Sequence, residues 1–171
     1  MRRGNSPSPP FIGKEINKME KTYSFVKNVR GSLSFPLYNY DMTVKRGFTI
    51  AHNVTKIVVP HQFALGLFVT PSALQQFKNG YFTIENFKDL VKDAMEKGLC
   101  AEEEYPDIAS LIEIEQMITT NNTVKIRKLL SKKNPIEISN LISFAKEHYG
   151  KLNQTNKNLI EQECGVELEV E

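Results

Sequence analysis

The residues whose types and spacing could do chemistry are concentrated in one basic segment of the chain. Five cations fall within nine residues there: Lys125, Arg127, Lys128, Lys132 and Lys133. Asn121-Asn122-Thr123 precedes them as a helix-capping sequence, and Asn134-Pro135 follows as the start of a second helix. A helix, a short turn and a second helix form the outline of a helix-turn-helix DNA reader. A charged outer helix face, or a face that docks an acidic neighbour, has the same pattern.

Two features of the sequence favour a docking face over a DNA reader. Glu137 stands near the start of the second helix, where a groove-reading helix usually carries Arg, Gln or Asn. Residues 136–171 hold seven acids against three bases, an excess that repels phosphate. We therefore predict a protein partner for the basic segment and keep nucleic acid as the alternative.

The aromatic and basic residues of the first third form a second candidate surface for nucleic acid. They are Tyr23, Phe25, Phe35, Tyr38, Tyr40 and Phe48, among Lys27, Arg30, Lys45 and Arg46. Bases of single strands stack on exposed rings while cations bind the phosphates. In a small barrel, however, about half of such rings must belong to the core.

Motifs of catalysis and metal binding are not found in the sequence. It holds no GxGxxG, GxxxxGK[ST], HExxH or GxSxG. His52 and His61 could form a zinc site with a cysteine, but their spacing matches no standard pattern. Glu102-Glu103-Glu104 could bind a cation but lacks the spacing of a calcium loop, so we expect a solvated linker. His148 is expected to be solvated. We predict no enzyme, no metal and no cofactor.

Residues 1–21 are interpreted as an extended basic arm that contacts a partner. Ser6-Pro7-Ser8-Pro9-Pro10 favours a polyproline-like chain, and almost no core-forming pattern accompanies it. The start of the chain has two arginines but no apolar segment behind them, unlike a secretory signal. The arm residues expected to bind a partner are Arg2, Arg3, Pro9, Pro10, Phe11 and Lys14.

The elements that must position these residues change type along the chain. Between Tyr23 and Val69, apolar residues alternate with period two, which predicts a small antiparallel β sandwich or barrel over residues 22–69. Short strands are expected at 42–45 and 65–69, with a tight turn at Arg46-Gly47 between strands. Composition supports a folded core: 40% of the 171 residues are hydrophobic, and two distant cysteines indicate reduced thiols. No apolar run is long enough to span a membrane.

Residues 70–171 are predicted to form short helices with a terminal strand. The strongest pattern runs from Tyr81 to Gly98, where apolar residues recur with helical period behind Thr83 as the N-cap. Further helices are expected to start at Thr70-Pro71 and at Pro106-Asp107, and a last one to end at Gly165. The closing VELEVE alternates and predicts an edge strand. The fold class is therefore α+β: an arm at 1–21, a β domain at 22–69 and a helical domain at 70–171.

The net charge of +2 hides blocks of opposite sign. Residues 1–60 carry ten bases against three acids, residues 99–119 six acids and no base, and residues 120–135 five bases and no acid. Such blocks suit a protein that touches neighbours of opposite sign, copies of itself included. They equally suit solvated helix faces.

The layout resembles that of small structural proteins of tailed bacteriophages, such as head, connector or tail accessory components. The likeness rests on the strand opening Tyr23-Ser-Phe-Val-Lys-Asn28, on TPSALQQFKNGYFTIENF from Thr70 to Phe87, and on the short capped helices after them. It implies a virion component without catalysis that binds other structural proteins and is assembled in the host cytoplasm. We therefore predict a non-enzymatic assembly protein, with a nucleic-acid-binding regulator using residues 124–133 or the β face as the alternative.

Overall fold

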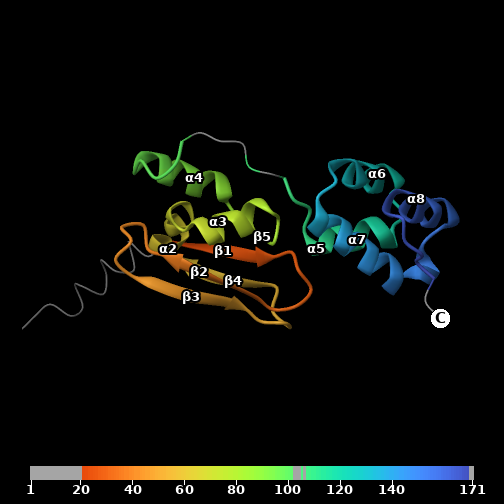
Figure 1. Cartoon of the computed structure of the whole chain (residues 1–171), viewed down its shortest axis with the longest axis horizontal. Coiled ribbons are helices and arrows are strands. Elements are labelled where there is room, and N and C mark those ends of the chain that lie inside the picture. The colour runs from red at the N-terminus through yellow and green to blue at the C-terminus, as the bar shows by residue number, and fades with distance from the viewer. Residues whose placement is uncertain (1–20, 102–104, 106, 170–171) are drawn as a thin grey trace, which may run out of the picture.

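The computed structural model describes residues 21–101, 105 and 107–169, and these residues form two lobes side by side (Figure 1). The β lobe, residues 21–101 and 105, holds two antiparallel sheets and three α-helices. The helical lobe, residues 107–169, holds four α-helices. The predicted α+β class is therefore confirmed.

The core of the β lobe is a layer of phenylalanine rings between the two sheets. The ring of Phe35 stacks on that of Phe82 with centroids 4.8 Å apart and on that of Phe25 at 5.8 Å. Alternation places all three rings inward, which is why these short strands form a sandwich. One sheet has the order β4 (Lys56–Pro60), β1 (Thr22–Lys27), β5 (Phe82–Ile84); the other pairs β2 (Leu33–Tyr38) with β3 (Lys45–Ile50).

Three α-helices and one 3-10 helix complete the β lobe. At Gly66 the helical segment passes close to β2, since an added Cβ would lie 1.5 Å from the carbonyl oxygen of Tyr38. Only glycine lets the chain pass so near the end of β2. These helices are α2 (His61–Leu65), η1 (Gly66–Val69), α3 (Pro71–Lys78) and α4 (Phe87–Glu96).

Capping side chains determine where the helices of the helical lobe begin. Ser110 and Glu113 form a reciprocal capping box, and asparagine side chains cap three later helices. Buried Ile114, Ile126 and Leu141 come from three different helices and share one core. The elements are α5 (Leu111–Thr119), α6 (Thr123–Lys132), α7 (Pro135–Glu147), η2 (Tyr149–Lys151) and α8 (Gln154–Cys164).

The lobes contact each other through α7 and the loop after β1. The side-chain amide of Asn140 donates to the backbone carbonyl of Asn28, and both residues are buried. Beside them, the guanidinium of Arg30 lies 4.6 Å from the centre of the Phe144 ring and pairs with Glu147 at 2.6 Å. One face of α7 is therefore occupied by the junction.

Four predicted element boundaries are wrong in the β lobe. The helix predicted from Thr83 starts at Phe87, because Phe82–Ile84 pairs with β1 as a strand. Residues 42–44 are not a strand, and β3 runs through the predicted turn at Arg46-Gly47. The apolar run 65–69 is helical rather than extended, since short apolar runs do not distinguish the two.

Two predictions are also wrong in the helical lobe. The helix expected at Pro106-Asp107 begins at Leu111. Residues 166–169 of the predicted edge strand have no strand structure; instead, Leu168 is buried and its backbone N–H donates to the Glu161 carboxylate at 3.0 Å. Residues 170–171 lie outside the described part of the chain.

The boundary between the two hydrophobic cores lies between Tyr105, which packs against the core of the β lobe, and Ala109, which packs against the core of the helical lobe. Helices α3 and α4 contribute Ala73, Phe77 and Leu90 to the core of the β lobe, and the second core begins with Ala109 and Leu111. The division of the chain at residue 69 stays a prediction. Within the described residues, no helix is long and apolar enough to cross a membrane.

Candidate functional site

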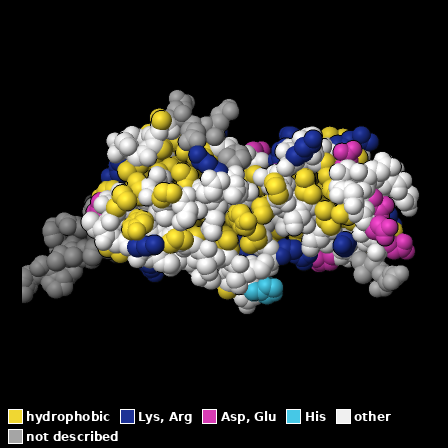
Figure 2. Space-filling model, viewed as in Figure 1, with side chains coloured by type: hydrophobic (Ala, Val, Ile, Leu, Met, Phe, Trp, Pro, Cys, Tyr) yellow, Lys and Arg dark blue, Asp and Glu magenta, His cyan; other side chains and the backbone are white. Residues whose placement is uncertain are grey.

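The basic residues of the segment 125–133, predicted to bind a partner, lie on the exposed side of α6 and at its C-cap, Lys133. Asn122 caps this helix, accepting from the backbone N–H of Lys125 at 3.1 Å. Ile126, Leu129 and Leu130 point into the core, so the helical period turns the cations outward. Figure 2 shows the dark-blue Lys and Arg side chains gathered over α6. The basic face consists of the exposed residues Lys125, Arg127, Lys128, Lys132 and Lys133.

Lys132 differs from the other four cations of the basic face because it is tied to the fold. Its ammonium lies 2.9 Å from a carboxylate oxygen of Glu137 and donates to the carbonyl of Asp107 at 2.7 Å. Glu137 itself is fully buried, and the same oxygen accepts from the backbone N–H of Ala109 at 3.0 Å. For the other four cations, no ion pair with another described residue is found.

A small hollow of about 200 Å³ opens beside the basic face. Lys125, Lys128 and Lys132 line it, and Glu113 and Glu137 are among its acidic lining residues. The second carboxylate oxygen of Glu137 is buried without a hydrogen-bond partner among the described residues. The hollow therefore mixes both signs of charge instead of presenting cations alone.

The packing of α7 does not fit a groove-reading helix. Glu137, Asn140 and Phe144 are buried along it, and its exposed positions include one base, Lys146. A recognition helix must present several polar side chains to base edges. Here the corresponding helix packs against the core and against the β lobe. The acidic residue noted in the sequence, Glu137, is thus a buried structural group.

The aromatic residues of the β lobe do not form an exposed stacking surface. Tyr23, Phe25, Phe35 and Phe48 are buried, whereas Tyr40 is exposed to 38%. Lys27, predicted to line that surface, is 4% exposed and donates to three backbone carbonyls at 2.7–2.9 Å. Four of the six rings therefore belong to the core, in line with the expectation that about half of them would.

A cluster of titratable groups that the sequence did not suggest lies where the described chain begins. The Asp93 carboxylate, on α4, is 3.1 Å from the ammonium of Lys21, 3.1 Å from the His61 ring and 3.3 Å from the Tyr23 hydroxyl. Burial raises the pKa of Asp93, but the hydrogen bonds and charges of Lys21 and His61 outweigh it and hold that pKa below its ordinary value. Burial likewise raises the pKa of Tyr23. The cluster fixes Lys21 against α4.

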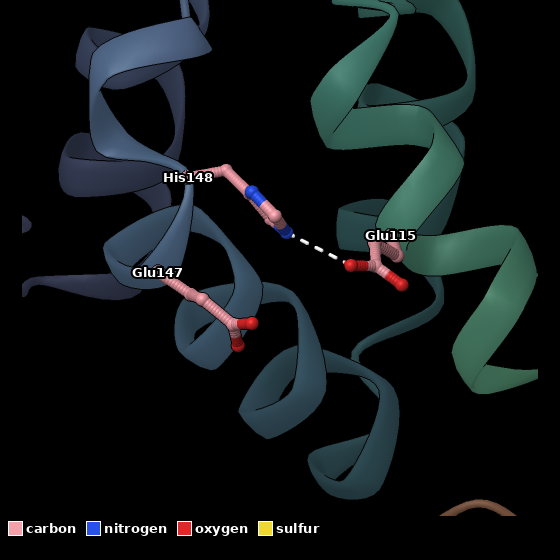
Figure 3. Close-up of side chains that lie close together, drawn as sticks. All are labelled: Glu115, Glu147 and His148. Atoms are coloured by element: carbon pink, nitrogen blue, oxygen red, sulfur yellow. Dashed lines mark hydrogen bonds and ion pairs between the residues drawn. The ribbon is translucent and has the colours of Figure 1, made fainter.

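A second cluster joins α5 to the end of α7. Figure 3 shows His148 and Glu115 pointing toward each other, with Glu147 beside them. The ring nitrogen Nε2 of His148 is 2.9 Å from a Glu115 carboxylate oxygen. The prediction that His148 is merely solvated is therefore wrong. Of the described residues, His52 and His61 belong to no group of three metal donors.

The remaining predicted site residues lie outside the described part of the chain. They are Arg2, Arg3, Pro9, Pro10, Phe11 and Lys14 of the arm, together with the acidic run Glu102–Glu104. Comparisons with protein-family models, with curated proteins and with solved structures each gave no match to this chain. The function must therefore be inferred from the geometry of the basic face and the two clusters.

Proposed function

We propose that the protein is a non-enzymatic assembly component that binds acidic surfaces of neighbouring proteins through the basic face of α6. The observation that carries this proposal is that four of its five cations have no ion pair with any other described residue. Val124, on the same helix, is 78% exposed and supplies an apolar contact beside them. Charge complementarity with an acidic surface is what such a face offers a protein partner.

The spacing of the cations gives a physical reason to expect a partner. Lys125 and Lys128 are three residues apart, so their like charges are neighbours on the helix surface, whereas the charge of Lys132 is already paired with Glu137. Each like-charged pair of this kind destabilises a helix by about 0.2–0.5 kcal/mol. An acidic neighbour removes that repulsion on binding. The helical lobe thus carries a small energetic cost that an assembly relieves.

A protein partner fits the surroundings of the basic face better than nucleic acid does. Glu113 and Glu137 line the adjoining hollow among the lysines, so the cations there form no continuous basic track of the kind that follows a run of phosphates. The helix that would read base edges, α7, is packed internally. Nucleic acid would meet the cations alone, without a device for reading sequence.

The wider assembly follows from the remaining sequence features. Other structural proteins of one particle, and copies of this chain, are the proposed partners, with the basic arm adding contacts of its own. Charge complementarity sets the orientation of such contacts and speeds encounter. Membership of a phage virion stays a prediction from the resemblance in layout.

The test compares two charge reversals of equal size. Lys125→Glu with Lys128→Glu reverses the basic face, and Lys88→Glu with Lys92→Glu reverses two exposed lysines of α4 as the matched control. Fluorescence anisotropy measures binding of labelled poly-L-glutamate and of a 20-base-pair duplex at 150 mM NaCl. We expect the first reversal to weaken poly-glutamate binding at least tenfold, and the control to weaken it less than twofold.

Two outcomes contradict the proposal. Equal losses in both variants would mean that only net charge matters. Tighter binding of the duplex than of poly-glutamate, with a steep salt dependence lost on the first reversal, would favour the nucleic-acid alternative. Sedimentation velocity on the same samples reports whether copies of the chain are among the partners.

A further inference from the structure

Glu115, Glu147 and His148 bring three metal-donor side chains to one point on the helical lobe. Glu115 lies in the middle of α5, and the other two residues end α7 (Figure 3). One ligand atom from each residue can be chosen so that all three lie within 4.8 Å of one another. Residues distant in sequence, two carboxylates and one imidazole, are thus assembled by the packing of two helices.

The closest pair of these donors, His148 and Glu115, has the spacing of two ligands on one ion, and the Glu147 carboxylate, within 4.8 Å of them, has to draw closer to bind the same ion. Zinc binds imidazole nitrogen and carboxylate oxygen at about 2.0–2.2 Å, so two such ligands about 90–110° apart are separated by about 2.8–3.6 Å. The distance from Nε2 of His148 to the Glu115 oxygen is 2.9 Å, at the lower end of that range. An ion can therefore replace the proton between these two atoms with little movement of either helix.

Two neighbours hold the donors in place. The His148 ring stacks on the Phe144 ring, with centroids 6.4 Å apart and planes 15° apart. Glu147 is held at 2.6 Å by Arg30 from the β lobe. Outer contacts of this kind orient first-shell ligands in metal sites. The negative end of the α7 dipole, where His148 lies, also favours a cation.

The geometry points to a site for a zinc-class divalent cation formed by Glu115, Glu147 and His148. Imidazole with two carboxylates suits zinc or a similar transition metal better than calcium or magnesium, which take oxygen ligands. On binding, Nε2 loses its hydrogen, by a shift of the proton to Nδ1 or by its release to solvent, and its lone pair takes the ion. Water completes the coordination.

Metal binding at this cluster also affects the junction between the lobes. Glu147 is the partner of Arg30, whose loop belongs to the β lobe. A bound ion fixes α5 to the end of α7 and, through Glu147 and Arg30, to the β lobe. The inference does not rest on the basic face of α6, and its failure leaves the proposed function untouched.

Isothermal titration of the full chain with zinc chloride, at pH 7.5 with a non-thiol reductant, tests the site. We expect one ion per chain with a micromolar dissociation constant. His148→Ala and Glu115→Gln should each weaken binding at least tenfold. His52→Ala, which removes an exposed imidazole elsewhere, is the matched control and should change it less than twofold.

The near-isosteric Glu115→Gln keeps the test interpretable if His148→Ala disturbs the fold, and circular dichroism without metal checks both variants. A rise in melting temperature with zinc in the unmodified protein, absent from Glu115→Gln, would support the site. The inference is overturned if millimolar zinc does not bind, or if binding persists in a folded Glu115→Gln variant.

Discussion

Replacing Lys132 by methionine should separate the structural cation of the basic face from the four that make no ion pair with a described residue. Methionine keeps the apolar stem of the lysine but removes the ammonium that lies 2.9 Å from Glu137. Glu137 is then left as a fully buried carboxylate whose remaining partner among the described residues is the N–H of Ala109. An unpaired buried charge is strongly destabilising.

The burial of the two partners sets the expected size of the loss. Breaking a fully buried ion pair costs about 3–5 kcal/mol. The side chain of Lys132 is 34% exposed while that of Glu137 is 0% exposed, so water reaches part of the site. Discounting for this solvation, we expect the free energy of unfolding to fall by about 2–3 kcal/mol. That loss corresponds to a melting temperature about 5–10 °C lower for a chain of this size.

Urea denaturation followed by circular dichroism measures this difference, with Lys128→Met as the matched control on the same helix. The control should change stability by less than about 0.5 kcal/mol, because Lys128 is exposed and has no ion pair with a described residue. Glu137→Gln should cost less than Lys132→Met, since it leaves no buried charge. Equal effects of Lys132→Met and Lys128→Met would refute the structural role of the Lys132 ion pair.

Two further predictions concern the β lobe. Gly66→Ala should destabilise the protein by about 3 kcal/mol or more, because its Cβ would lie 1.5 Å from the Tyr38 carbonyl oxygen. The control Gly31→Ala, whose Cβ would have nothing within 4 Å, should fold normally. A soluble Gly66→Ala variant with an unchanged urea midpoint would contradict the close packing of Gly66 against β2. The lowered pKa of Asp93 means that its contacts add stability above about pH 4, the ordinary range for aspartate, and lose it as the pH falls through the folded-state pKa. Asp93→Asn should therefore lose more stability relative to the unmodified protein at pH 6 than at pH 2.5, and an equal difference in urea midpoint at both pH values would argue against this role.

Much of the fold is predictable because its signals are local. Asn122, Asn134 and Gly165 mark helix ends where the sequence indicates them, since capping depends on neighbouring residues alone. The start of α5 has an equally local signal, the capping box of Ser110 and Glu113, which lies after the Pro106-Asp107 pattern from which the helix was expected to start. The errors at residues 65–69 and 82–84 have another origin. Short apolar segments take the structure that their tertiary neighbours impose.

The candidate sites were predictable only in part, for the same physical reason. The basic face of α6 follows from helical period and composition, so its cations could be placed outward without coordinates. The burial of Glu137 could not be foreseen, because it depends on the path of residues 107–110 across the start of α7. Likewise, Glu115 and His148 are 33 residues apart, and no spacing rule connects them.

The polar side chains of α7 make internal contacts whereas most cations of α6 face outward, which is why we expect a partner to bind α6. Three polar residues along α7 are engaged inside the molecule: Glu137 with Lys132, Asn140 with the loop after β1, and Glu147 with Arg30. Because these contacts hold the lobes and the chain segment before α5 in place, α7 cannot turn its polar face to another molecule without loosening the fold. Apart from Lys132, the cations of the basic face make no ion pair with a described residue. Substitutions there can change binding while leaving stability intact, which is the property that an assembly surface requires.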